Sequence, residues 1–597
     1  MSSPLTPVIL PSPSPVATPL ISAASPSPNP SPNLNAPTAF TPTPSPSPNS
    51  TPTPLPSPEL SPSERTIFSA INADPPTLPQ ALSPALETVA MISTPTNAEI
   101  SERIGGLEGS FQKDFQQYLG IEPRSSVNRE ANSGNSEQRS SATSSNQTTS
   151  SGNSEQTTSS GNSEQRSSAT SSGTPEQTAN SGTPDDELSN VTNLSQQANA
   201  QYSLQETQVK LNRITETTRV KPALIYVFFA PPGGSNDFNS ANLAAQTNRA
   251  ARNNDSLEVI LITGQTSPVR VQFPKTTRRQ VLEVANNFRS EVTNFRNSKG
   301  YLNPAQQMHQ WFIAPLEKEL QKQGIDNLVF LMDTGLRSIP LAAMHDGEGF
   351  VVERYSVGLM PSLNLTEPTY NPLDGSQVLA MGATTFGNSG LNPLPSVSLE
   401  LNTVSRLWEG SEFLNETFTL NNLIQQRQNR PFRMIHLATH GVFNPGDRSN
   451  SYIQLWDGRL RLDQLDQLNW GNPPVDLLVL SACQTALGDR DAELGFAGLA
   501  INAGVRSALA SLWEVNDVAT LGLMTKFYQQ LQVASTKSEA LRLAQLAMIR
   551  GEVRLEDGNL VIQDGRIPLT AELRSLGDLQ LIHPYFWSAF TMVGNPW

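Results

Sequence analysis

Apolar positions divide the chain into a stretch that almost lacks them and a stretch that is dense with them. Between residues 122 and 187 there is no Leu, Ile, Met or aromatic side chain. From about residue 200 to Trp597, short apolar and β-branched runs alternate with longer amphipathic ones. Apolar strands that alternate with helices are typical of a mostly parallel sheet covered by helices on both faces. The sequence therefore predicts an α/β fold for the second stretch.

The lengths and flanking turn residues of these runs separate strands from helices. Strands are predicted at residues 223–229, 257–264, 269–273, 327–332, 377–383, 434–438, 476–482 and 507–513. Helices are predicted at residues 278–296, 304–323, 397–407, 417–428 and 493–503, the second of them ending at Gly324. Asp457-Gly458 predicts a hairpin turn, with a short helix over 462–468 after it.

The N-terminal third has the composition of disordered chain. Nineteen of the 48 prolines lie in the first 60 residues, so residues 1–64 are expected to be a Pro/Ser-rich disordered segment. The hexamer SGNSEQ occurs at 133–138, 151–156 and 160–165, and it lacks the apolar face that stacked repeats need. Residues 123–199 are therefore expected to be a disordered insert.

Residues 65–122, between these two segments, are expected to be partly helical. Five apolar residues recur there at steps of three or four, which is the pattern of one face of a helix: Ile104, Leu107, Phe111, Phe115 and Leu119.

Charge and composition exclude several classes of protein. A net charge of −14 without a basic stripe argues against binding to nucleic acid or to an anionic membrane. No apolar run approaches the ~18 residues of a membrane span, and the N-terminus lacks a secretory signal, so a cytoplasmic location is expected. The single cysteine excludes an internal disulfide or a multi-cysteine metal site. We expect neither a metal nor a cofactor.

Two predicted strands end in residues that can do chemistry. His440 follows the strand at 434–438, and Cys483 follows the strand at 476–482. Sites of open α/β sheets form at the carboxyl ends of strands, so neighbouring strands would place the two residues at one edge. An imidazole there can take the thiol proton and later return it to a leaving amine. The backbone amides of Gly441 and Cys483 are candidates for an oxyanion hole.

Each of these residues also has a plainer interpretation. An isolated cysteine is more often a buried packing residue, although its position at a strand end favours catalysis here. His436 lies within the strand and is expected to be a core histidine. Trp513 is a candidate wall of a substrate pocket, or a core tryptophan. Glu493 is a candidate pocket residue, or an acid at the start of the helix over 493–503.

Five segments, in this order, resemble the CHAT family of caspase-like domains. They are "LVFLMDTGLRSIPLAAMHDGEGFVVERYSVGLMPS", "HLATHG", "LVLSACQTALGD", "GLAINAGVRSALASLWEVND" and "HPYFWSAFTMVG". The resemblance covers roughly residues 200–597, together with the helix near 100–120. It implies a caspase-hemoglobinase fold and hydrolysis of peptide bonds through a thioester. His440 matches the base of the family, Cys483 its nucleophile and Gly441 the glycine after the histidine.

The chain departs from the family pattern in two respects. It has no 34-residue period, so the tetratricopeptide repeats of many relatives are absent from the sequence. Ser481 stands two residues before the cysteine, where relatives that cut after Lys or Arg commonly carry Asp. Ser481 is therefore a candidate pocket residue without an implied specificity.

The resemblance divides the folded part at residue 326. Residues 200–325 are expected to be an N-terminal α/β extension, and residues 326–597 the caspase-like CHAT domain. The expected function is that of a cysteine endopeptidase with a protein substrate or an activating protein partner. The alternative is a catalytically silent scaffold that uses the same fold to bind another protein.

Overall fold

The computed structural model describes residues 90–119, 204–231, 252–442, 451–483, 495–563 and 565–597. The predicted disordered segments 1–64 and 123–199 lie outside this part of the chain, as does Glu493. Of the partly helical segment predicted at 65–122, residues 90–119 are described.

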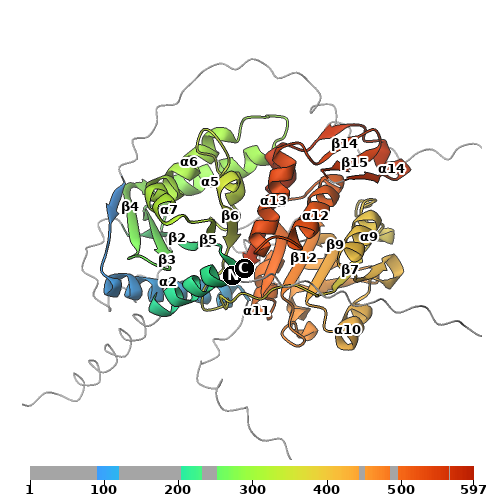
Figure 1. Cartoon of the computed structure of the whole chain (residues 1–597), viewed down its shortest axis with the longest axis horizontal. Helices are drawn as coiled ribbons and strands as arrows, with labels where there is room; N and C mark the ends of the chain where they lie inside the picture. The colour runs from blue at the N-terminus through green and yellow to red at the C-terminus, as the bar shows by residue number, and fades with distance from the viewer. Residues whose placement is uncertain (1–89, 120–203, 232–251, 443–450, 484–494, 564) are drawn as a thin grey trace, which may run out of the picture. The chain divides into compact units, whose positions relative to one another are not determined.

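A 14-stranded mixed sheet forms the centre of the described fold (Figure 1). From one edge to the other its main path contains β1 (Met91–Ser93), β4 (Val269–Thr277), β3 (Ser256–Thr263), β2 (Pro222–Ala230), β5 (Asn327–Met332), β6 (Ser356–Leu359), β18 (Phe590–Gly594), β13 (Ser507–Ser511), β12 (Leu477–Cys483), β9 (Met434–Val442), β10 (Tyr452–Gln454) and β11 (Arg459–Arg461). Off this path, β7 (Val378–Gly382) pairs with β9, and β8 (Ser411–Leu414) pairs with β7.

The sheet contains two parallel blocks that run in opposite directions, and antiparallel strands extend it beyond each block. Neighbouring strands are parallel throughout β2-β5-β6-β18, and again throughout β13-β12-β9-β7-β8. The blocks meet at the antiparallel pair of β18 with β13. Consequently the carboxyl ends of β5 and β6 lie at the opposite edge from those of β9 and β12. The site expected at His440 and Cys483 therefore belongs to the second block.

Burial explains why the central strands read as continuous apolar runs. Every residue of β2, β5, β7 and β13 is buried, as a strand covered on both faces requires. β2 pairs in parallel with β5, so the sheet continues across residue 326. The domain boundaries given above stay predictions.

Helices cover the sheet, and a smaller sheet is inserted near the C-terminal end. The helices are α2 (Asn97–Leu119), α5 (Arg278–Thr293), α6 (Leu302–Phe312), α7 (Glu317–Gln323), α8 (Val351–Arg354), α9 (Val397–Leu407), α10 (Leu420–Asn429), α11 (Gly495–Asn502), α12 (Asp517–Leu531), α13 (Lys537–Ile549), α14 (Ala571–Arg574) and α15 (Pro584–Trp587), and a further helix spans residues 204–218. The smaller sheet contains β16 (Gly565–Pro568), β15 (Asn559–Ile562), β14 (Arg554–Glu556) and β17 (Leu579–Gln580).

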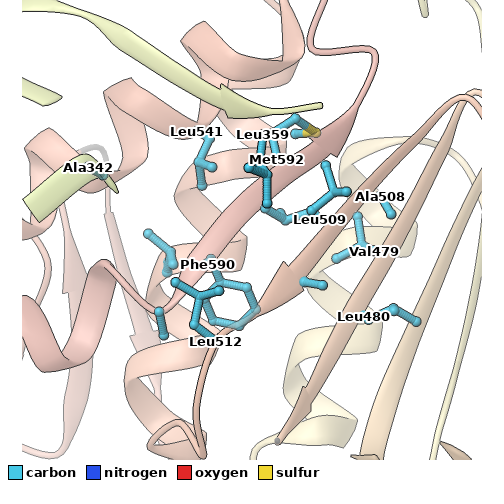
Figure 2. Close-up of a cluster of buried hydrophobic side chains, with 14 of the residues drawn as sticks. Ala342, Leu359, Val479, Leu480, Ala508, Leu509, Leu512, Leu541, Phe590 and Met592 are labelled. Atoms are coloured by element: carbon cyan, nitrogen blue, oxygen red, sulfur yellow. The ribbon is translucent and has the colours of Figure 1, made fainter. Parts of the chain in front are cut away.

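The hydrophobic core is continuous across the junction of the two blocks. Leu359 of β6, Met592 of β18, Leu509 of β13 and Val479 of β12 are buried side chains from successive strands (Figure 2). Leu541 of α13 is buried in the same cluster. Burial of a Leu or Met side chain stabilises a fold by about 1.5–3 kcal/mol, so this row of contacts holds the oppositely directed blocks together.

Helix α2 joins the fold across the long insert. Its residues Ile104 and Phe111 pack in a second core cluster with Leu224 of β2. Glu108 accepts hydrogen bonds from Tyr226 Oη at 2.8 Å and from Ser362 Oγ at 2.6 Å. Burial raises the pKa of Glu108. The predicted helix is confirmed, and its apolar face docks on residues more than one hundred positions away in sequence.

Most of the predicted strands and helices are present, but some bounds are wrong. Strands β4 and β9 each run four residues further than predicted, so His440 lies within β9 and not after it. One predicted helix is divided in two. The helix predicted at 304–323 is broken into α6 and α7 by a 3₁₀ turn at Ala314–Leu316. Pro315 at the start of this turn has no N–H to continue the α-helical ladder. Gly324 ends α7 in the left-handed conformation, with φ of 63°. In the described part of the chain, no helix has the length and apolar character to cross a membrane.

Candidate functional site

Strands β9 and β12 are parallel neighbours, and their register is continuous. Met434 lies opposite Leu477, and six steps later His440 lies opposite Cys483. The condition for the predicted site, that the two strands are neighbours, is met. Directly opposite positions of a parallel pair belong to the same face of the sheet, so positions 440 and 483 share a face at one strand edge.

His440 is held by a main-chain acceptor from the loop after β7. Its ring is buried, with 8% of the residue exposed, and its Nε2 lies 2.8 Å from the carbonyl oxygen of Asn392. A carbonyl oxygen can only accept, so Nε2 carries the proton of the neutral ring and Nδ1 carries the lone pair. The ring of Phe386 packs against the imidazole with centroids 4.7 Å apart. Nδ1 is therefore the nitrogen that can act as a base.

The surroundings of His440 favour the neutral ring. Burial lowers the pKa of His440 below its ordinary value of 6.5, and the Asn392 carbonyl and the Glu514 carboxylate oppose part of this effect. A group with a lowered pKa is largely unprotonated at neutral pH. His440 can accept a proton there without first losing one.

A buried polar network lies on the same two strands, two residues before Cys483 on β12 and four residues before His440 on β9. Ser481 Oγ of β12 donates to Oε1 of Glu400, on α9, at 2.5 Å. Nε2 of His436, on β9, lies 3.0 Å from the same oxygen. The three residues are 7%, 2% and 0% exposed in the order Ser481, Glu400, His436. One carboxylate oxygen thus joins the strand of His440 to the strand of Cys483.

The network continues onto α12. Nδ1 of His436 lies 3.2 Å from Tyr528 Oη. Burial, and then the Glu400 carboxylate, raise the pKa of Tyr528 well above its ordinary value, so the hydroxyl keeps its proton. A carboxylate beside Nε2 favours the proton on that nitrogen and leaves Nδ1 to accept from the tyrosine.

The beginnings of α9 and α12 are fixed to each other. Ser396 N donates to Asp517 Oδ2 at 2.8 Å, and Ser396 Oγ donates to the Asp517 carbonyl at 3.0 Å. Burial of the carboxylate is the main reason that the pKa of Asp517 rises to about 7, and the Ser396 hydrogen bonds oppose it. Glu400 adds a smaller increase. The hydrogen bonds of Ser396 thus fix the start of α9 to the start of α12.

The remaining predicted site residues occupy different surroundings. Gly441 lies opposite Ile453 in the antiparallel pair of β9 with β10. Trp513 follows β13, is 1% exposed and donates from Nε1 to the Tyr585 carbonyl at 3.2 Å. Ser481 contacts Glu400 as described. The catalytic, oxyanion and pocket roles of these residues stay predictions.

Sequence reasoning missed Glu400, Asn392, Tyr528 and Asp517. Glu400 had a signal, because it falls on the apolar face of the predicted helix 397–407, beside Val397 and Leu401. A charge on such a face needs a buried partner. Asn392 contributes its backbone carbonyl, which any residue has, so its side chain gave no indication.

Metal-ligand geometry is absent from the part of the chain that the structure describes. Among those residues, no group of three or more His, Cys, Asp or Glu side chains is arranged to hold a metal ion.

Residues 302–595 match the family model of the CHAT domain. This range includes β9, β12, α9 and α12, and therefore the whole site described above. The chain therefore carries a CHAT domain, as the resemblance implied. No curated protein matches the chain.

The solved structures that match the chain have low sequence identity and low TM-scores to it. Separase from Saccharomyces cerevisiae, in a separase–securin complex, is 10% identical with a TM-score of 0.39, over 68% of this chain and 31% of that one. The Arg-specific cysteine proteinase gingipain R is 13% identical with a TM-score of 0.31, over 49% of this chain and 67% of that one. The chain thus spans about a third of the separase chain. At these TM-scores the likeness carries no weight for function.

Proposed function

We propose that the chain is a cysteine endopeptidase in which Cys483 is the nucleophile and His440 the general base. The observation that carries the proposal is the register of β9 and β12, which sets His440 opposite Cys483 at the carboxyl ends of both strands. The Asn392 carbonyl on Nε2 of His440 supports it, because it leaves Nδ1 as the basic nitrogen. The CHAT domain at residues 302–595 agrees with this chemistry.

The reaction proceeds through a thioester. Nδ1 of His440 takes the proton of the Cys483 thiol, and the thiolate attacks the carbonyl carbon of a peptide bond. When the tetrahedral intermediate collapses, the C–N bond breaks, and the histidine returns the proton to the leaving amine. Water then attacks the thioester with His440 again as base, which releases the acid product and the thiol.

The amides of Gly441 and Cys483 are proposed to stabilise the oxyanion. Removal of one such donor typically costs about 2.7–4 kcal/mol of transition-state stabilisation. Ser481, Trp513 and Glu493 are proposed to line the substrate pocket. The proposed partner is a protein substrate or a protein that activates the enzyme. Neither a cofactor nor a metal takes part in the proposed reaction.

The single cysteine makes a direct test possible. A peptide carrying a thiol-reactive group is added to the purified protein, and the labelled position and the rate are determined by mass spectrometry. We expect labelling at Cys483, none in Cys483→Ala, and much slower labelling in His440→Ala. His345→Ala is the matched control, because that histidine caps a turn in the first parallel block, where Gly347 N donates to its ring.

Equal labelling rates in the wild type and in His440→Ala would contradict the paired mechanism. Absence of labelling by peptide probes, with and without added cell lysate, would favour the alternative of a silent scaffold. If peptide probes do not label the protein, a small reagent such as iodoacetamide is added as well. Labelling by iodoacetamide shows that the thiol is accessible but does not react with peptides, and no labelling shows that the thiol is covered.

A further inference from the structure

Glu400 contacts both strands of the proposed catalytic pair. Its contacts are with earlier residues of these strands, and not with Cys483 or His440. Its Oε1 accepts from Ser481, two residues before Cys483, and lies beside His436, four residues before His440. Within the described residues, no Lys or Arg forms an ion pair with Glu400. A buried carboxylate without a cationic partner is costly, so these contacts are what retains it.

The segment that leads into α9 delivers the carbonyl that holds His440. Asn392 is followed by Pro393-Leu394-Pro395-Ser396, in which two prolines fix φ near −65°. Leu394 N donates to the Thr384 carbonyl at 2.9 Å, which closes the loop after β7. A stiff segment of this kind transmits the position of the helix start to Asn392.

Two buried contacts fix that helix start. Asp517 binds Ser396 at the first turn of α9, and Glu400 binds both strands one turn later. The loop, the helix and the strands are therefore linked in one path from Glu400 to the ring of His440.

We propose that Glu400 is a positioning residue for the catalytic pair, which ties α9 to β9 and β12 and thereby keeps the Asn392 carbonyl on Nε2 of His440. Glu400 acts on the tautomer of His440, without touching the substrate. This inference rests on the proposed function for its effect on rate, while its effect on the tautomer is independent of any activity.

Paired variants separate positioning from ordinary stability. Glu400→Ala removes both contacts, whereas Glu400→Gln keeps an oxygen that can accept from Ser481. Glu108→Ala is the matched control, because Glu108 is a buried carboxyl that also accepts from a serine and a tyrosine hydroxyl, in the first parallel block. All three variants are first checked for folding by thermal unfolding.

The first measurement is the tautomer of His440, from ¹⁵N and ¹³C chemical shifts of labelled histidine in the Cys483→Ala background. We expect wild-type and Glu400→Gln protein to hold the proton on Nε2, and Glu400→Ala to give a mixture of tautomers. Glu108→Ala should keep the wild-type tautomer. An unchanged tautomer in folded Glu400→Ala would overturn the proposal, as would an equal change in Glu108→Ala.

The second measurement is the rate at which the peptide probe labels Cys483. Small misplacements of a reacting group commonly cost roughly ten- to a hundredfold in rate, and we expect a loss of this size in Glu400→Ala with rescue in Glu400→Gln. If wild-type protein is not labelled, the proposed function fails while the tautomer experiment still decides the role of Glu400. If Glu400→Ala does not fold, Ser481→Ala replaces it. We then expect a partial shift of the His440 tautomer, and an unchanged tautomer would contradict the proposal.

Discussion

Nε2 of His440 donates a hydrogen bond to the carbonyl oxygen of Asn392 across 2.8 Å. This contact assigns separate tasks to the two ring nitrogens, because the nitrogen that holds the proton cannot also accept one. The residue that orients the proposed base is thus a main-chain carbonyl, supplied from 48 residues earlier in the sequence. Four predictions follow from the surroundings of this site and of the sheet that supports it.

Replacing Glu514 by Gln should lower the pKa of His440. Burial already lowers this pKa, and the Glu514 carboxylate raises it in part. Loss of that negative charge leaves the burial effect less opposed, so the pKa should fall further below 6.5. The measurement is an NMR titration of His440 in the Cys483→Ala background. In active protein, the acid limb of the labelling rate should move to lower pH by the same amount.

Glu348→Gln is the control for this titration, because Glu348 is exposed and lies in a turn of the first parallel block. It should leave the pKa of His440 where it is. A rise in this pKa in Glu514→Gln would show that the two groups do not interact as described.

Replacing Asp517 by Asn should flatten the dependence of stability on pH. The pKa of Asp517 is raised from 3.8 to about 7 in the folded protein. Between these values the folded state binds the additional proton, so the free energy of unfolding falls as pH rises through this window. Asn keeps an oxygen for the Ser396 amide and does not titrate, so this part of the fall should disappear. Urea unfolding across pH 4–7 measures it.

Asp457→Asn serves as the comparison for Asp517→Asn. Asp457 is exposed in the hairpin turn, and Asn-Gly suits such a turn as well as Asp-Gly does. Its unfolding curves should follow those of the wild type at each pH. If Asp517→Asn did the same, the raised pKa of Asp517 would be wrong.

Replacing Glu258 by Ala should strongly destabilise the antiparallel strands β3 and β4 and the docking of α2. Glu258, on β3, binds Arg270 of β4 through both carboxylate oxygens and Arg103 of α2 at 2.8 Å. All three residues are buried, at 4%, 5% and 8% exposure respectively. Removing one partner of a buried pair leaves uncompensated charge and typically costs about 3–5 kcal/mol. Chemical denaturation gives the loss, and hydrogen exchange should report that α2 opens first.

Glu556→Ala provides the contrast with Glu258→Ala. Glu556 forms ion pairs with Arg554 and Arg566 at the partly exposed surface of the smaller sheet. Exposed pairs contribute about 0–1 kcal/mol, so the loss should be small. Similar losses in both variants would contradict the burial argument.

Replacing Gly382 by Ala should disturb the contact between β7 and β9. An added Cβ would lie 2.4 Å from the carbonyl oxygen of Ala438 and 2.8 Å from Val397 Cγ1. The strand and the start of α9 must then move apart, at a cost of about 1–3 kcal/mol. Ala438 precedes His440 by two residues, so we also expect slower labelling of Cys483. Thermal unfolding and the labelling rate are measured together.

The same substitution in open space is the control for Gly382→Ala. Gly109 lies in α2, and a Cβ there would meet no atom within 4 Å. Ala is the better helix former, so Gly109→Ala should raise stability by about 0.5–1 kcal/mol. Destabilisation by both variants would contradict the argument, because of these two positions only Gly382 gives an added Cβ a close contact.

Local patterning in the sequence determined much of the fold. The strand at 327–332 and the helix at 397–407 have the predicted bounds, because a continuous apolar run and a 3.6-residue period each define one kind of element. Strands β6 and β18 were missed, since four or five residues resemble any short apolar run. The break at Pro315 was missed because the apolar period continues through it.

For the site, the sequence by itself determined that a histidine and a cysteine end two apolar strands, and that an acid lies on the apolar face of a nearby helix. The tertiary structure decided that the strands are neighbours in register and that Asn392 orients the imidazole. It also decided that Glu400 joins Ser481 to His436, with Ser481 located 81 residues away. Hydrogen bonds between residues so distant in sequence depend on how strands and helices pack, and periodicity carries no record of that packing.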